Sequence, residues 1–137
     1  MNKITTLAAF TLTSALALQG CSDVPVQNFR NSPIHMNKAY PSLSEVEVAI
    51  IRGGTNAGWQ MRVVKPGQIN AKLFEDKHMA EVTISFSTTL YNINYLNSEN
   101  LDFTSKAGKP DEIYEDYNVW VQDLDKSIRK ELIAKSQ

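Results

Sequence analysis

The chain has 137 residues with 14 basic and 15 acidic side chains, which gives a formal net charge of −1. This length suits one domain with a modest core, and a near-neutral charge without a basic cluster argues against nucleic acid as a partner. The single cysteine excludes a disulfide framework.

Residues 1–20 have the layout of a secretory signal peptide. Lys3 and the terminal amino group form a positive start, and residues 4–18 carry no charge. The apolar run is shorter than the roughly 20 residues of a transmembrane helix, and no stop-transfer cluster follows it. We therefore expect residues 1–20 to be a signal peptide that is removed on export.

The next feature is the sequence Leu-Gln-Gly-Cys at residues 18–21, which resembles the lipobox of bacterial lipoproteins. The resemblance implies cleavage between Gly20 and Cys21, a diacylglyceryl group on the Cys21 sulfur, and acylation, such as palmitate, of the new amino terminus. Two or three acyl chains on one residue make a stable membrane anchor. The alternative, a buried unreactive thiol, fits poorly with a cysteine that stands between an apolar run and a polar, proline-containing segment.

Position +2 after the cleavage site predicts the membrane of residence. In Gram-negative lipoproteins, aspartate at position +2 is the usual signal for retention in the inner membrane. Ser22 at this position resembles the residues found in lipoproteins that are sorted to the outer membrane. Asp23 lies one residue too late for that signal. The resemblance therefore implies an outer-membrane lipoprotein that faces the periplasm.

Residues 21–41 are predicted to be the lipidated N-terminus and a mostly extended tether that lifts the domain off the membrane. Pro25, Pro33 and Pro41 interrupt this segment, and it has no periodic apolar pattern. Its apolar residues exceed what a linker needs: Val26, Phe29, Ile34, Met36 and Tyr40. We expect the last of these residues to dock onto the domain. A single domain is then predicted for residues 42–137.

The predicted domain begins with a helix over residues 42–52. Ser42 and Glu45 form a capping-box pattern, and apolar residues recur at helical spacing behind them. Gly53 and Gly54 are expected to end this helix.

Four runs with period-2 alternation then predict strands at residues 59–63, 69–73, 80–86 and 91–95. Such a repeated pattern with short turns is typical of an antiparallel meander with one buried face.

A second helix is predicted from about residue 110 to residue 135. Its apolar stripe consists of Tyr117, Val121, Leu124, Ile128 and Leu132. Its first turns hold acids that match the helix dipole: Asp111, Glu112, Glu115 and Asp116. The predicted fold class is α+β, with an N-terminal helix, a four-stranded antiparallel meander and a C-terminal amphipathic helix, both helices on one sheet face.

No set of residues in the sequence has the pattern of a catalytic or metal site. His35 and His78 lack metal-ligand spacing to each other or to the cysteine. An aromatic group can form a platform for a sugar or peptide, but its helical and strand spacing is more typical of a core: Tyr91, Tyr95, Tyr114, Tyr117 and Trp120. The polar sheet face is more typical of an ordinary solvent face than of a binding surface: Gln60, Arg62, Asn70, Lys72, Glu81, Thr83, Asn92 and Asn94. We therefore expect the protein to have no enzymatic activity, no bound metal and no cofactor.

Two motifs resemble a group of small uncharacterised Gram-negative lipoproteins. The first is S-x-N-L, with Ser98, Asn100 and Leu101. The second is Y-N-x-W-V-x-x-L, which comprises Tyr117, Asn118, Trp120, Val121 and Leu124. The match spans about residues 57–133 and implies a lipid anchor and a small α+β domain without an assigned activity. Where the group often has a histidine, this chain has Tyr114. Asn100 and Asn118 can equally serve the fold by bonding exposed backbone.

These features predict a non-enzymatic binding or interaction module in the periplasm, held to the membrane by acyl chains on Cys21, with a protein of the envelope as its partner. The alternative is an inhibitor or protective protein against a secreted enzyme such as a cell-wall hydrolase, acting through residues 73–79 or 101–110. A binding module would have an exposed apolar or aromatic patch, an inhibitor a rigid protruding loop, and an enzyme a concave polar pocket.

Overall fold

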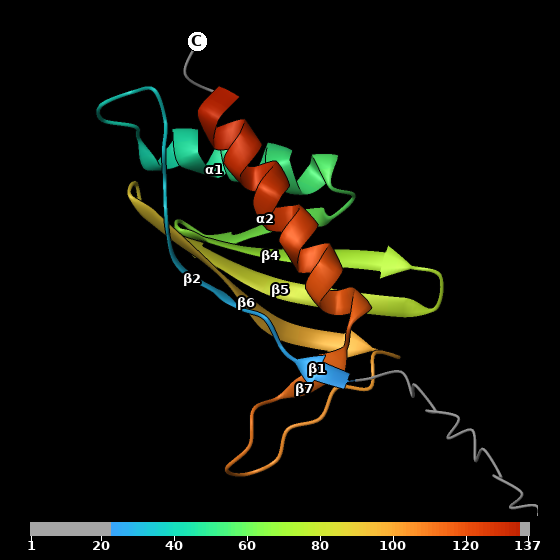
Figure 1. Cartoon of the computed structure of the whole chain (residues 1–137). Coiled ribbons are helices and arrows are strands. Elements are labelled where there is room, and N and C mark those ends of the chain that lie inside the picture. The colour runs from blue at the N-terminus through green and yellow to red at the C-terminus, as the bar shows by residue number, and fades with distance from the viewer. Residues whose placement is uncertain (1–22, 135–137) are drawn as a thin grey trace, which may run out of the picture.

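The computed structural model describes residues 23–134. Its elements, in chain order, are β1 (Asp23–Pro25), β2 (Phe29–Pro33), α1 (Leu43–Asn56), β3 (Gln60–Lys65), β4 (Gln68–Glu75), β5 (His78–Phe86), β6 (Leu90–Glu99), β7 (Glu112–Tyr114) and α2 (Asp116–Ala134). Figure 1 shows α2 crossing the main sheet, with α1 beside its C-terminal half. The predicted α+β class is confirmed.

The main sheet has five antiparallel strands in the order β2-β6-β5-β4-β3. Strands β3 to β6 are the predicted meander, but β2 adds a fifth strand beside β6, and β1 pairs with β7 in a separate two-stranded sheet. The prediction of four strands was therefore incomplete. Val63, expected on the buried face, is 45% exposed because it lies on the edge strand β3.

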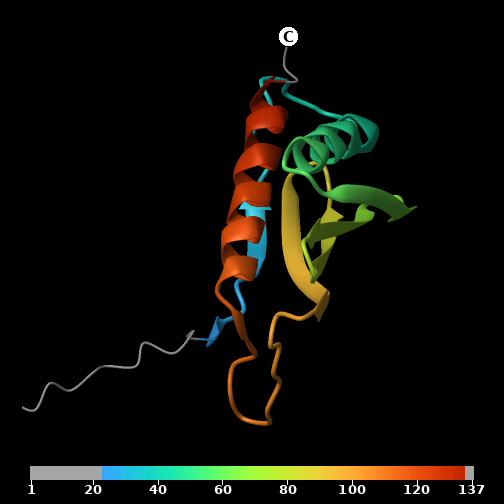
Figure 2. The ribbon, with the colours of Figure 1, turned by 90° about the vertical axis from the view of Figure 1, so that its right-hand side faces the viewer.

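One face of the sheet forms the core with both helices. Along β4 and β5, buried residues alternate with half-buried ones, as period-2 patterning requires. The predicted stripe of α2 is fully buried against this face, and α1 contributes Val46, Ala49 and Ile50 to the same cluster. Figure 2 shows the helices layered beside the sheet.

Residues 23–33 lie in the fold rather than in a tether, which corrects the prediction for residues 21–41. Asp23 pairs with Tyr114, and β2 pairs with β6. Prolines end both strands, and proline is tolerated there because β1 and β2 each have only one neighbouring strand. Of the apolar residues in this segment, Val26, Phe29, Ile34 and Met36 pack against the core. The expectation that the last of them docks was wrong for Tyr40, which is 90% exposed.

Asparagine side chains hold this N-terminal segment where regular pairing stops. The register of β2 against β6 shifts between Phe29 and Ser32. Just before it, the Asn118 side chain accepts the Gln27 N–H at 2.9 Å and donates to the Pro25 carbonyl at 2.9 Å. Two more side-chain oxygens accept backbone N–H groups nearby: Asn28 from Tyr95 and Asn92 from Asn31. The expected backbone bonds of Asn118 and Asn100 are therefore present, the latter to the Lys77 carbonyl at 2.7 Å.

Helix α1 begins as predicted and ends later than predicted. The Ser42 side chain accepts the Glu45 N–H, and the Ser42 N–H donates to the Glu45 carboxylate at 2.8 Å. Gly53 and Gly54 do not end the helix, which continues to Asn56. A Cβ on Gly53 would lie 2.6 Å from the Ile128 Cα, so this glycine allows α1 and α2 to approach closely.

Helix α2 begins at Asp116 rather than near residue 110. The preceding residues instead form β7, because Ile113 is buried opposite Val24 of β1 and Glu112 exchanges backbone hydrogen bonds with Thr104. Of the acids predicted for the first turns, only Asp116 belongs to the first turn of the helix.

Candidate binding surface

The predicted lipidation and cleavage residues, Cys21 and Gly20, lie outside the described residues, so they remain predictions. The first described residue, Asp23, stands two positions after Cys21. Within residues 23–134, no helix combines the length and apolar character needed to cross a membrane.

The two histidines lie at separate places in the fold. His35 is exposed after β2, and His78 begins β5 with its ring 6.4 Å from that of Trp120. In the described part of the chain, no three His, Cys, Asp or Glu side chains are grouped to hold a metal ion.

Two of the five aromatic residues considered for a platform lie inside the molecule, and the other three are half-buried: Tyr95, Tyr114 and Trp120. Tyr91 and Tyr117 are fully buried, and the Tyr95 ring stacks on Phe103 at 4.2 Å. Burial raises the pKa of Tyr117 well above its ordinary value. Tyr91 and Tyr117 therefore serve the core, as their spacing favours.

A buried polar network joins β6 to α2. The Tyr91 hydroxyl donates to Asp125 Oδ1 at 2.5 Å, and Arg129 Nε lies 2.8 Å from Asp125 Oδ2. Burial, followed by the hydrogen bond to Asp125, raises the pKa of Tyr91 far above its ordinary value. Asp125 was not singled out from the sequence, although its position four residues after Val121 and three before Ile128 places it on the apolar stripe.

The polar sheet face holds a shallow hollow of about 380 Å³ between β3, β4 and β5. Arg62, Lys72 and Glu81 supply its charges, and the Lys72 ammonium lies 3.8 Å from the Glu81 carboxylate. Opposite charges thus meet on this face, as on an ordinary solvent face.

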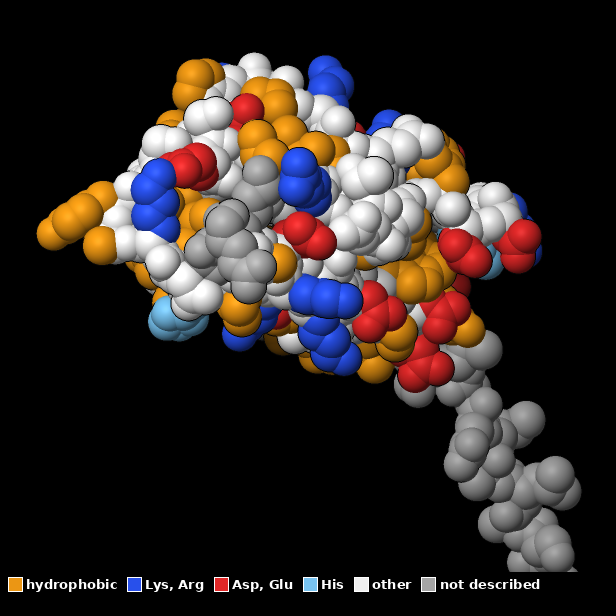
Figure 3. All heavy atoms as spheres, turned by 90° about the horizontal axis from the view of Figure 1, so that it is seen from above, with side chains coloured by type: hydrophobic (Ala, Val, Ile, Leu, Met, Phe, Trp, Pro, Cys, Tyr) orange, Lys and Arg blue, Asp and Glu red, His pale blue; other side chains and the backbone are white. Residues whose placement is uncertain are grey.

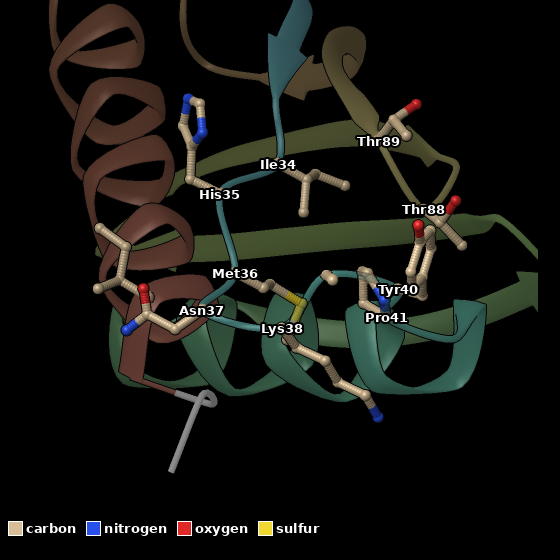
Figure 4. Close-up of a pocket in the computed structure, with 11 residues that line it drawn as sticks. Ile34, His35, Met36, Asn37, Lys38, Tyr40, Pro41, Thr88 and Thr89 are labelled. Atoms are coloured by element: carbon tan, nitrogen blue, oxygen red, sulfur yellow. The ribbon is translucent and has the colours of Figure 1, made fainter.

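A larger hollow of about 810 Å³, here called the distal hollow, lies at the end of the molecule away from β1. It is formed by residues 34–41, by Thr88 and Thr89 in the β5–β6 turn, and by Ile133 of α2. Figure 4 shows Ile34, Met36, Tyr40 and the two threonines around it. No local sequence pattern indicates this site, because it joins segments more than 40 residues apart in the chain.

Two interactions hold residues 34–41 in place. The Ile34 N–H donates to the Thr89 carbonyl at 2.8 Å, and Lys38 Nζ forms an ion pair with Glu45 Oε1 at 2.6 Å. The hydrogen bond from Lys38, with those from Ser42, lowers the pKa of Glu45 to about 2. The segment is therefore attached at the β5–β6 turn and near the start of α1. Between these points His35 and Asn37 are exposed, whereas Met36 packs against the core.

Apolar side chains are exposed around the distal hollow. Tyr40 is 90% exposed and Ile133 55%. Figure 3, which looks down on this end, shows hydrophobic side chains between scattered charges of both signs. With the Thr88 and Thr89 hydroxyls and the Asn37 amide, the distal hollow offers apolar contact and hydrogen bonds together, which suits an amphipathic ligand such as a protein segment.

The two segments proposed for an inhibitory loop differ in the structure. Residues 73–79 form the turn end of the β4–β5 hairpin, in which Glu75 pairs with His78, so they are strand ends joined by a tight turn rather than a long loop. Residues 101–110 belong to a connection between β6 and β7 that extends from the β1 end of the molecule (Figures 1 and 2).

The comparisons with known proteins gave no match: no family model, curated protein or solved structure is significantly similar to this chain.

Proposed function

We propose that the protein is a lipid-anchored, non-enzymatic binding module of the bacterial envelope. Acyl chains on Cys21 hold it at the outer membrane, on the periplasmic side, and the distal hollow binds a segment of another envelope protein. The observation that carries this proposal is Tyr40, an aromatic side chain left 90% exposed beside an open hollow with apolar and hydroxyl-bearing walls.

The residues that line the distal hollow and its position in the molecule both support a protein partner. Tyrosine supplies large contact area with little loss of conformational freedom and is enriched in binding hot spots. Residues 37–40 are exposed and belong to neither a helix nor a strand, so an incoming chain can reach them. The hollow also lies at the opposite end of the molecule from β1, where the anchor would join (Figure 1).

The test combines intact mass with crosslinking. Membrane-extracted protein should have the mass of residues 21–137 plus acyl chains, and Cys21→Ser should lose this modification. Crosslinking in cells should then capture a partner, with capture reduced about tenfold or more by Tyr40→Ser, as for a hot-spot residue. The matched control is Val119→Ser, since Val119 is 52% exposed on α2. Equal capture by Tyr40→Ser and wild type would refute the role of the hollow.

The alternative, inhibition of a secreted hydrolase, draws on the connection that includes residues 101–110. Residues 105–110 are all exposed, and a backbone bridge between Thr104 and Glu112 holds their base. Inhibition of a cell-wall hydrolase that is lost in Lys106→Ala and kept in Tyr40→Ser would favour this function over the first. Absence of inhibition across a panel of such hydrolases would reject it.

A further inference from the structure

We propose that the turn at residues 106–109 rests on the lipid headgroups, so that the domain stands on its membrane with the distal hollow pointing away from it. This inference rests on the proposed anchor at Cys21. It concerns which end of the folded domain contacts lipid, a question that the anchor alone does not answer.

The short connection to the anchor limits where the domain can lie. Asp23 already pairs with Tyr114, and only two peptide steps separate it from Cys21. Two steps span at most about 7 Å, whereas each headgroup layer of a bilayer is about 5–7 Å thick. Once the acyl chains are inserted, β1 must therefore lie at the outer boundary of the headgroups, with no tether to raise it.

The connection between β6 and β7 extends from this same end of the molecule. Its base is held to β7 by two backbone hydrogen bonds between Thr104 and Glu112, of 2.9 and 3.0 Å. Glu112 itself pairs with Pro25 of β1. Figures 1 and 2 show the connection projecting past β1, so a membrane at the level of the anchor meets it.

The chemistry of the tip suits lipid phosphates. The Lys109 N–H donates to the Lys106 carbonyl at 3.1 Å, and Gly108 has a φ of +76°, which gives a tight turn with a lysine at each end. Residues 105–110 contain both lysines and no acid, whereas exposed acids surround β1, among them Asp23, Glu112 and Glu115. On an anionic membrane the turn is therefore the part of this end that lipid attracts.

The experiment uses the acylated full-length protein in vesicles of phosphatidylethanolamine and phosphatidylglycerol that carry a headgroup nitroxide. Acylation leaves no free thiol, because Cys21 is the only cysteine. A fluorophore can then be placed through Ala107→Cys in the turn or through Ala39→Cys beside the distal hollow, both exposed positions. We expect the nitroxide to quench most of the fluorescence in the first variant and little in the second. Adding Lys106→Gln and Lys109→Gln to Ala107→Cys should reduce that quenching.

The outcomes separate the two proposals. An acylated protein whose two labels are quenched equally, or whose Ala39→Cys label is quenched more, would overturn the orientation and leave the anchor intact. Quenching of the Ala107→Cys label that is insensitive to the lysine substitutions would overturn the role of the turn's charge. An unacylated mass would refute the anchor and this inference with it. Circular dichroism of each variant checks that the fold is retained.

Discussion

The closest approach of the two helices can be tested by adding one methyl group. In Gly53→Ala, the new Cβ would lie 2.6 Å from Ile128 Cα and 2.8 Å from Ile128 N. These are backbone atoms of α2, so no side-chain rotation can relieve the overlap. The two helices must move apart, which also stretches the 2.7 Å hydrogen bond from the Ser127 hydroxyl to the Gly53 carbonyl.

The expected loss of stability is the sum of two destabilising terms and one stabilising term. Overpacking in a dense core costs about 1–3 kcal/mol, and a clash with backbone belongs at the upper end. The weakened Ser127 hydrogen bond adds about 1 kcal/mol. Alanine recovers about 1 kcal/mol over glycine in helix propensity. We therefore expect Gly53→Ala to lower the free energy of unfolding by about 2–3 kcal/mol.

The neighbouring glycine provides the matched control. Gly54→Ala has the same gain in propensity, but its Cβ would meet the flexible Met61 side chain, so we expect a change within about 1 kcal/mol. Urea unfolding followed by circular dichroism, in the Cys21→Ser background, measures both, and the midpoint of Gly53→Ala should fall by about 1 M or more. A Gly53→Ala variant as stable as wild type would refute the close crossing of the helices.

Three further predictions use the same unfolding assay. Asn118→Ala should cost about 1–2 kcal/mol and speed amide exchange in residues 25–27, which its side chain holds; unchanged exchange would contradict this role. Asp125→Ala should lower the free energy of unfolding by about 3 kcal/mol, because the loss of the carboxylate leaves both Tyr91 and Arg129 without this partner. Tyr91→Phe should lower it by about 1–2 kcal/mol; the reverse order would be inconsistent with the network. Because the folded-state pKa of Glu45 is lowered to about 2, its stabilising effect is complete above about pH 4.5 and is lost as the pH falls toward 2; the stability difference between wild type and Glu45→Gln should shrink over that range, and a constant difference would argue against it.

The regular elements were predictable because their patterns are local. Each pattern depends only on residues within one helix or one strand. Examples are the capping box at Ser42, the alternation of β3 to β6 and the apolar stripe of α2. The boundaries were less predictable. A short strand such as β7 gains its stability from a partner 87 to 91 residues away in the chain, as in the pairing of Asp23 with Tyr114. No local sequence pattern indicates that partner.

The candidate site depended even more on distant contacts. From the sequence, Tyr40 was an apolar residue expected to dock, and Thr88 and Ile133 had no assigned role. They surround one hollow because β2 pairs with β6 and α2 packs across the sheet. The sequence motif at Cys21 remains the basis for the proposed anchor, and the pairing of Asp23 is the basis for the proposed orientation.

The sequence by itself determined the α+β class, the four strands of the meander, the cap of α1 and the buried face of α2, since the periodicity of burial follows from the sequence of each element. Only the tertiary structure decided that the N-terminal segment joins the sheet and that Gly53 marks a helix crossing rather than a helix end. The physical reason is that a glycine or an edge strand has no preferred role until a second segment approaches it, and which segment does so depends on the packing of the whole chain.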